Sequence, residues 1–231
     1  MLWLMGYRNA FLLVFFTLIN SSFMNHAKYT MLCLGDSYTI GESVAENERF
    51  AEQAVQMLLQ GGITFKQPEI IAKTGWTTDE LALAIEERGL KQKFDFVTLL
   101  IGVNNQYRGR DLENYRAEFK GLLETAIQYA GGNSKHIIVI SIPDWGATPF
   151  VSQDPKHRSA AQIAAEIDAF NAIGKEEAVK AHAHFIDITP HSRKATSEVT
   201  LVANDGLHPS GKMYSHWATE LSNLITKIVQ H

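Results

Sequence analysis

Cysteine is nearly absent from this sequence, since Cys33 is the only one among 231 residues. A single cysteine excludes an internal disulfide framework, so the burial of apolar side chains has to stabilise the fold. Cys33 lies in the apolar run of residues 29–34, where we interpret it as a small buried side chain of a β-strand. We therefore expect it to have no chemical role.

The sequence also lacks an excess of charge of one sign. The 21 Lys and Arg residues nearly balance the 25 Asp and Glu residues, which gives a formal net charge of -4. There is no block of like charges of the kind that binds a phosphate backbone or an anionic lipid surface. We therefore expect no nucleic-acid partner. With 45% hydrophobic and 20% charged residues, the composition is that of an ordinary globular domain.

Motifs for metal ions and for phosphate-bearing cofactors are missing as well. His182 and His184 are two positions apart, but neither an HExxH pattern nor a cluster of cysteine ligands accompanies them. The segment Gly35-Asp36-Ser37 lacks the second and third glycines of a dinucleotide-binding fingerprint. We therefore expect neither a metal site nor a cofactor.

A compact hydrophobic run occurs only near the start of the chain. Arg8 precedes ten apolar-rich residues, 10–19, and polar residues 20–22 follow them. This order is typical of a signal peptide, and the run is shorter than the ~20 residues that cross a bilayer as a helix. We expect residues 1–27 to be a signal peptide or an N-terminal anchor of an exported protein, in which only this segment contacts a membrane. If Met24 is the true start, we expect the protein in the cytoplasm.

Residues 28–231 fit one domain, because single hydrophobic cores go on growing to about 250 residues. Short apolar runs alternate with longer stretches of helical periodicity, which is the pattern of βαβ units around a parallel sheet. Strands are predicted at 29–34, 69–73, 94–101, 136–142 and 184–188, and helices at 49–60, 78–89, 112–130, 160–181 and 210–229.

These elements predict an α/β fold, a flavodoxin-like three-layer α/β/α sandwich around five parallel strands. The strands are apolar nearly throughout rather than alternating, so both faces of the sheet should be buried. In such sheets ligands bind beyond the carboxyl ends of the strands. The residues that follow the strands are therefore where functional groups are expected.

Four unusual segments occur at these places. Gly35-Asp36-Ser37-Tyr38 follows the first strand, Lys73-Thr74-Gly75-Trp76 the second, and Gly102-Val103-Asn104-Asn105 the third. Residues 204–210, which contain Asp205 and His208, precede the last helix, and Ser210 is its expected N-cap. Each segment alone is a weak signal. Together they bring a hydroxyl, an imidazole with a nearby carboxylate, a glycine N–H and a carboxamide to one rim.

In this order the segments resemble the SGNH/GDSL hydrolase superfamily, whose markers are a serine, a glycine, an asparagine and a histidine. Ser37, Gly75, Asn104 and His208 match these markers, and Asp205 matches the acid of the last block. Two positions differ from the family pattern. Tyr38 replaces the leucine of the family's name, and Asn105 stands where an aspartate usually follows the marker asparagine. The second difference leaves the hydrogen bonding of that loop to be established.

The resemblance implies a serine esterase or acylhydrolase that cleaves carboxylic esters or thioesters through an acyl-enzyme on Ser37. A serine hydroxyl needs a neighbouring base, which His208 would supply and Asp205 would orient. The oxyanion hole would consist of the N–H groups of Ser37 and Gly75 and the side-chain amide of Asn104. The substrate would be a small-molecule ester: an acyl lipid, an acyl thioester or an acetylated sugar.

Other interpretations stay open from the sequence. In one of them the serine and the histidine are incidental to a non-catalytic, flavodoxin-like binding module, and a metal-dependent hydrolase fits less well. Among hydrolases, a carbohydrate acetylesterase is the alternative to a lipid acylhydrolase. Residues 143–159 form a long irregular stretch with three prolines and two aromatic residues, which either overhangs the site or is a surface excursion. Trp76 either lines a pocket or packs in the core.

Overall fold

The computed structural model describes residues 29–230 of the chain. The expected signal peptide or anchor at residues 1–27 lies outside the described residues, and so does the alternative start at Met24. No helix within 29–230 combines the length and the apolar character that are needed to cross a bilayer.

Five parallel strands form one sheet in the order β2-β1-β3-β4-β5. In chain order they are β1 (Met31–Gly35), β2 (Glu69–Ala72), β3 (Phe96–Leu100), β4 (Ile137–Ile140) and β5 (His184–Ile186). Every residue of β1, β3 and β4 is buried, as their apolar runs predict. Burial raises the pKa of the Cys33 thiol in β1 to about 12, which keeps this cysteine protonated and unreactive.

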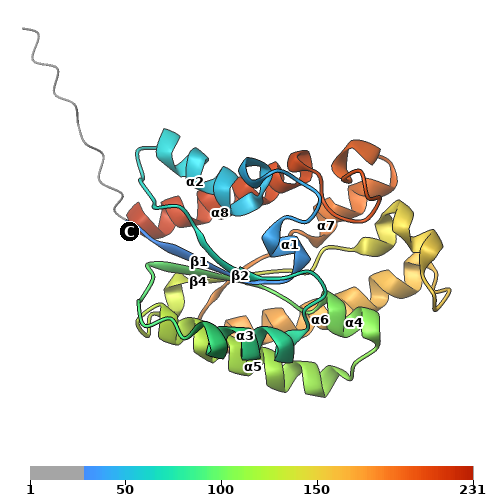
Figure 1. Ribbon diagram of the computed structural model, residues 1–231, viewed down its shortest axis with the longest axis horizontal. Helices are drawn as coiled ribbons and strands as arrows, with labels where there is room; N and C mark the ends of the chain where they lie inside the picture. The colour runs from blue at the N-terminus through green and yellow to red at the C-terminus, as the bar shows by residue number, and fades with distance from the viewer. Residues whose placement is uncertain (1–28, 231) are drawn as a thin grey trace, which may run out of the picture.

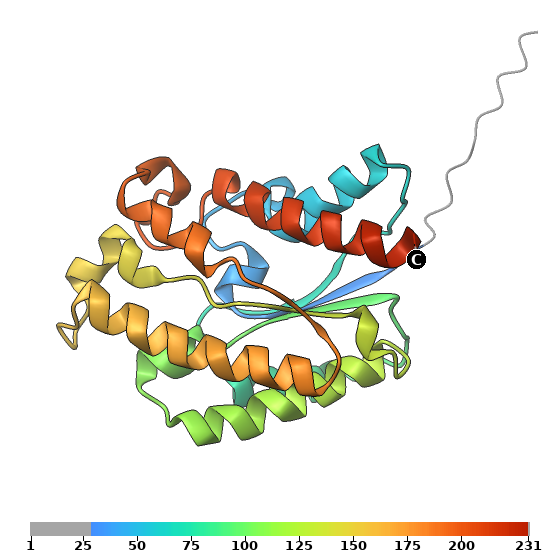
Figure 2. The ribbon, with the colours of Figure 1, turned by 180° about the vertical axis from the view of Figure 1, so that it is seen from behind.

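Helices cover both faces of the sheet (Figures 1 and 2). Within the described residues, α2 (Phe50–Gln60) and α8 (Gly211–Gln230) pack together on one face. The other face carries α3 (Thr78–Arg88), α5 (Leu112–Tyr129) and α6 (Ala160–Lys180). The buried residues of α5 recur at positions 115, 119, 122 and 126, so one stripe of this helix faces the sheet. The predicted three-layer α/β/α sandwich is confirmed.

Some predicted element ends are wrong by one or two residues. The strand predicted at 94–101 begins at Phe96, because the N–H of Phe94 donates to the carbonyl of Tyr129 rather than to a neighbouring strand. The strand predicted at 136–142 ends at Ile140, and the N–H of Ile142 donates to the side chain of Asn171 at 2.7 Å. Apolar runs report burial, and burial extends past the last residue that pairs with a neighbouring strand.

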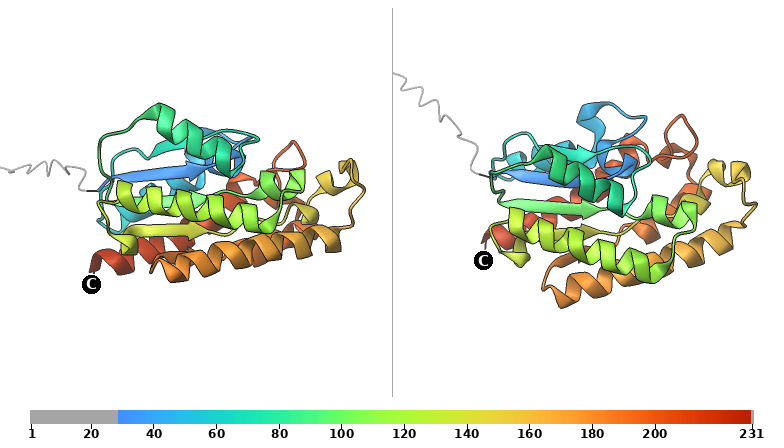
Figure 3. Two further views of the ribbon diagram at one scale, coloured as in Figure 1. Left: turned by 90° about the horizontal axis from the view of Figure 1, so that it is seen from below. Right: turned by 60° about the horizontal axis from the view of Figure 1, so that its bottom comes forward.

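Three short helices were not predicted: α1 (Ser37–Ile40), α4 (Val103–Arg108) and α7 (Thr189–Ser192). All three follow closely after a strand, at the end of the sheet where residues 143–159, drawn in yellow, also project (Figure 3). Gly35 at the end of β1 pairs with Ala72 of β2 and with Leu100 of β3. The chain therefore leaves these three strands at the same level.

Gly102 makes the sharp exit from β3 possible. Its φ is 129°, and a Cβ atom there would lie 2.7 Å from Cε2 of Tyr115 and 2.9 Å from Cδ1 of Ile142. Both the backbone conformation and the lack of space therefore exclude a larger residue at the N-cap of α4.

We predict that Gly102→Ala lowers the free energy of unfolding by more than about 2 kcal/mol, because the added methyl group meets both strain and overlap. Gly121→Ala, in the middle of α5, is the matched control. A Cβ at Gly121 meets nothing within 4 Å, so this change should raise stability by about 0.5 to 1 kcal/mol. Urea denaturation measures both, and equal stabilities of the two variants would contradict the assignment.

Candidate active site

A cavity of about 180 Å³ lies at the carboxyl end of the sheet, where the segments after β1, β2 and β3 meet. Ser37, Gly75, Asn104 and His208 all line it. Asp205 is not among the lining residues and instead holds the imidazole from behind. The structure thus places the five residues that the sequence singled out around one cavity, although they are up to 171 positions apart in the chain.

Ser37 is the first residue of α1, and Asp36 is the N-cap. Oδ1 of Asp36 accepts a hydrogen bond from the N–H of Tyr38 at 3.0 Å, and its carbonyl accepts from Thr39 and Ile40. The first N–H groups of a helix have no partner within the helix, and these contacts satisfy all but one of them. In residues 29–230, the N–H of Ser37 has no hydrogen-bond partner.

Gly75 provides a second N–H of the same kind. This group also has no hydrogen-bond partner in the described part of the chain, and the residue lines the cavity. Its φ is 88°, whereas a Cβ atom would meet no protein atom within 4 Å. The backbone conformation is therefore what requires glycine here. That the missing side chain also leaves room for a substrate stays a prediction.

Asn104 lies in the first turn of α4, next to the other two groups. Its Nδ2 donates to the carbonyl of Trp76 at 2.9 Å, which fixes the direction of the carboxamide. A carboxamide carries two N–H bonds, so one remains for a ligand in the cavity. The indole of Trp76 packs against the core and does not line the cavity, which settles the two interpretations of this residue.

Asn105, where the family usually has aspartate, is fully buried and joins α4 to α3. Its Oδ1 accepts from the N–H of Thr78 at 3.1 Å, and its Nδ2 donates to the hydroxyl of Thr78 at 2.6 Å. That hydroxyl in turn donates to Glu118. An aspartate at 105 would present a second carboxylate to a hydroxyl that has one proton. The amide is therefore the residue that completes this chain of hydrogen bonds.

The imidazole of His208 is held by Asp205. Its Nδ1 lies 2.6 Å from Oδ2 of Asp205, and the same oxygen accepts from the hydroxyl of Ser43 at 2.6 Å. Oδ1 of Asp205 accepts from the N–H groups of Leu207 and His208, both at 2.9 Å. Burial alone would raise the pKa of Asp205, but these hydrogen bonds outweigh it and hold the pKa well below its usual range. The carboxylate is therefore charged at neutral pH.

Two further contacts position His208 beside Ser37. The ring of Tyr38, the residue after Ser37, meets the imidazole edge to face, with the ring centroids 5.7 Å apart. Ser210, two residues after His208, caps α8 by accepting a hydrogen bond from the N–H of Met213 at 3.3 Å. The Ser37 hydroxyl and the imidazole line the same cavity but are not hydrogen bonded to each other in residues 29–230. Such bonds often tighten only when a substrate is present.

A family model identifies the relatives of this chain. The model of the GDSL-like lipase/acylhydrolase family matches residues 33–216. The chain belongs to this family. No curated protein matches the sequence.

Solved structures of GDSL proteins share the fold of this family member. A lipase/acylhydrolase from Enterococcus faecalis is 22% identical, with a TM-score of 0.63 over 85% of this chain and 95% of that one. An acetylxylan esterase from Geobacillus stearothermophilus is 20% identical, with a TM-score of 0.62 over 86% and 94%. An esterase from Pseudoalteromonas, in a structure inhibited by monoethylphosphonate, is 16% identical, with a TM-score of 0.60 over 88% and 100%.

Aromatic side chains that sequence reasoning did not single out complete the cavity of this GDSL protein. Tyr107 comes from α4, and Trp145 and Phe150 come from the irregular stretch 143–159. The N–H of Phe150 donates to the carbonyl of Gly206 at 3.0 Å, which ties this stretch to the turn that carries Asp205 and His208. The stretch therefore overhangs the site. Its two aromatic residues just after the fourth strand were the available signal.

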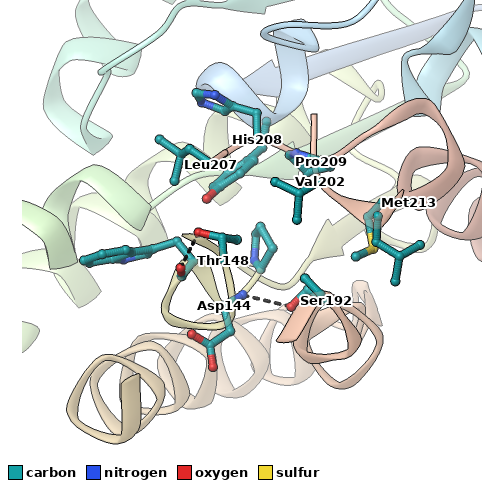
Figure 4. A pocket seen from close by; sticks show the side chains of 13 residues that line it. Asp144, Thr148, Ser192, Val202, Leu207, His208, Pro209 and Met213 are labelled. Carbon is teal, nitrogen blue, oxygen red and sulfur yellow. Dashed lines mark hydrogen bonds between the residues drawn. The ribbon is translucent and has the colours of Figure 1, made fainter. Parts of the chain in front are cut away.

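A smaller cavity of about 20 Å³ lies behind His208, on the side of α7 (Figure 4). Asp144 and Ser192 flank it, and the N–H of Asp144 donates to the Ser192 hydroxyl at 2.9 Å. This volume holds about one water molecule and is too small for a substrate. In the described part of the chain, no three His, Cys, Asp or Glu side chains are grouped so that they could hold a metal ion.

Asp36 is a fully buried carboxyl next to Ser37. Burial raises its pKa to about 7, although the hydrogen bond from the N–H of Tyr38 opposes this shift. Its second oxygen, Oδ2, is buried and has no hydrogen-bond partner among the described residues. The folded state therefore takes up a proton here at a higher pH than the unfolded chain does.

We predict that Asp36→Asn weakens the dependence of stability on pH. Because the pKa is higher in the folded than in the unfolded state, the free energy of unfolding of the wild type should fall as pH rises from about 4 to about 7 and level off above it. Asparagine keeps the acceptor for Tyr38 and removes the titration. Urea denaturation at pH 5 and pH 8 tests this, and equal differences between the two pH values in both proteins would count against it.

Proposed function

We propose that this protein is a serine esterase or acylhydrolase that cleaves a small-molecule carboxylic ester or thioester through an acyl-enzyme on Ser37. The observation that carries the proposal is the set of groups around one cavity. A serine hydroxyl, an imidazole on an ionised carboxylate and an anchored carboxamide meet there with two N–H groups that have no partner in the described part of the chain. Membership of the GDSL-like lipase/acylhydrolase family supports ester cleavage as their use.

The hydrogen bonds of Asp205 determine which imidazole nitrogen acts as the base. Because this carboxylate is ionised, it can only accept, so Nδ1 of His208 carries the proton. The lone pair on Nε2 is then free to take the proton of the Ser37 hydroxyl as the oxygen attacks the carbonyl carbon. Asp205 also stabilises the positive charge that develops on the ring.

The attack moves negative charge onto the carbonyl oxygen, which needs hydrogen-bond donors already in place. The N–H groups of Ser37 and Gly75 and the free N–H of the Asn104 amide supply three. The imidazolium of His208 then protonates the leaving alcohol or thiol, and the acyl group stays on Ser37. In the second half, His208 takes a proton from water as the water oxygen attacks the acyl carbon. The bond to Ser37 then breaks, His208 returns the proton to the Ser37 oxygen, and the carboxylic acid is released.

A carbohydrate acetylesterase is a second candidate, because an acetylxylan esterase is among the proteins of like fold. It would use the same residues on a smaller acyl group. The non-catalytic binding module has no comparable support, since it gives no role to the N–H groups of Ser37 and Gly75, which have no partner among residues 29–230. Export through residues 1–27, with membrane contact only through that segment, stays a prediction.

We predict that a fluorophosphonate probe labels Ser37 covalently and that Ser37→Ala abolishes both labelling and turnover of short p-nitrophenyl esters. His208→Ala should abolish turnover as well, because the hydroxyl then lacks its base. The exposed serine variant Ser152→Ala is the control and should label normally. Labelling that persists in folded Ser37→Ala, or wild-type turnover in either variant, would overturn the proposal.

Asn104→Ala should slow turnover roughly 10²- to 10³-fold, because one donor to the transition state is lost. Ser37 should still be labelled by the probe, since the hydroxyl and the base are unchanged. Asn223→Ala, an exposed asparagine on α8, is the matched control and should retain wild-type kcat. Unchanged turnover in Asn104→Ala would remove this residue from the oxyanion hole.

A further inference from the structure

One wall of the cavity consists of apolar and aromatic side chains. Val103 and Tyr107 lie four residues apart on α4, so they share one face of that helix with Asn104. Trp145 and Phe150 come from a different part of the chain, the stretch 143–159, and Leu207 directly precedes His208. No carboxylate, ammonium or guanidinium group lines the cavity among the residues that the structure describes. The wall thus suits an uncharged, apolar group.

Three hydrogen-bonded or stacked neighbours hold this wall in place. Nε1 of Trp145 donates to Oε1 of Gln106 at 2.8 Å, and the indole is only 2% exposed. The guanidinium of Arg158 lies over the rings of Trp145 and Tyr107, 5.2 and 5.7 Å from their centroids. Asp154 accepts two hydrogen bonds from that guanidinium, at 2.9 and 3.1 Å.

A wall held in this way gives the cavity a fixed size rather than one that adapts to its ligand. The guanidinium of Arg158, which is paired with Asp154, covers the rings of Trp145 and Tyr107. The indole N–H of Trp145 donates to Gln106 of α4. Moving either ring to admit a larger group would break its contact with Arg158, and moving Trp145 would also leave a buried donor unsatisfied. The limit on size is therefore steep.

The volume sets that limit. An apolar protein cavity of roughly 150 Å³ accommodates benzene, which has six carbon atoms. By the same measure, the 180 Å³ of this cavity accommodates about six or seven carbon atoms. An acetyl group would leave most of the wall uncovered, and most of a palmitoyl chain would stay in water.

We infer that this cavity binds the acyl part of the substrate and selects chains of about six carbons, with Phe150 as a residue that sets the length. This inference rests on the proposed esterase function. Phe150 suits the role because it contacts the cavity through its side chain but holds its own loop through its backbone N–H. Its one ring contact among the described residues is the edge-to-face contact with Trp145, at 6.0 Å.

The test measures kcat/KM for p-nitrophenyl esters from acetyl to palmitoyl. Each methylene from acetyl to hexanoyl should raise kcat/KM about fourfold, which corresponds to ~0.8 kcal/mol per buried CH₂. The hexanoyl ester, with four more methylenes, should therefore exceed the acetyl ester by roughly 250-fold, and esters longer than octanoyl should be cleaved more slowly. A maximum at acetyl, or a rise that continues to palmitoyl, would overturn the inference.

Variants at one position move the limit in both directions. Phe150→Ala should shift the best substrate to longer chains by at least two carbons, and Phe150→Trp should shift it to shorter chains. The acetyl ester, which would cover little of the wall, should change by less than about threefold in either variant. Val151→Ala, the neighbouring residue of the same loop that does not line the cavity, is the matched control and should keep the wild-type profile.

Labelling by the fluorophosphonate probe distinguishes a failure of the acyl-length inference from a failure of the proposed esterase function. If Ser37 is labelled but the chain-length profile is flat or does not respond to Phe150, the esterase proposal stands and the acyl-length inference is wrong. If the folded wild type is neither labelled nor active on any ester, the proposed function fails, and the inference fails with it.

Discussion

The candidate site depends on one carboxylate that accepts four hydrogen bonds. Two come from the backbone of its own turn, one from the hydroxyl of Ser43 and one from the imidazole. Together they join the turn before α8 to the segment that follows α1, across 162 positions of sequence. A carboxylate with this many donors stays ionised, and an ionised neighbour fixes which nitrogen of His208 is protonated. The carboxylate of Asp205 therefore determines both the position of the His208 imidazole and which of its nitrogens is protonated.

The sheet supplies the other half of the arrangement. Because β1, β2 and β3 end level with one another, the three segments that leave them start side by side, and short turns suffice to bring Ser37, Gly75 and Asn104 together. The positive φ of Gly75 and Gly102 shapes two of these turns. Within residues 29–230, the N–H groups of Ser37 and Gly75 stay without partners because the chain leaves its regular structure at these points.

The sequence predicted most of the sheet and four of the residues that line the cavity, for a physical reason. A strand covered on both faces leaves a continuous apolar run, which is visible without any structure, and the ends of such strands locate the site. The short helices α1 and α4 were not predictable, because four or six residues show no periodicity. The wall of Tyr107, Trp145 and Phe150 was missed because its members come from two segments that meet only in the fold. Trp76, next to the marker glycine, proved to be a partly buried residue that packs against the core.

The hydrogen bond from the N–H of Phe150 to the carbonyl of Gly206 joins the overhanging loop to the turn before α8 through main-chain atoms alone. Side chains of that loop can therefore be exchanged without loosening the turn that carries Asp205 and His208. In evolutionary terms, preference and chemistry are separable in the proposed site: point substitutions in the loop can change the shape of the cavity while Asp205 and His208 keep their places.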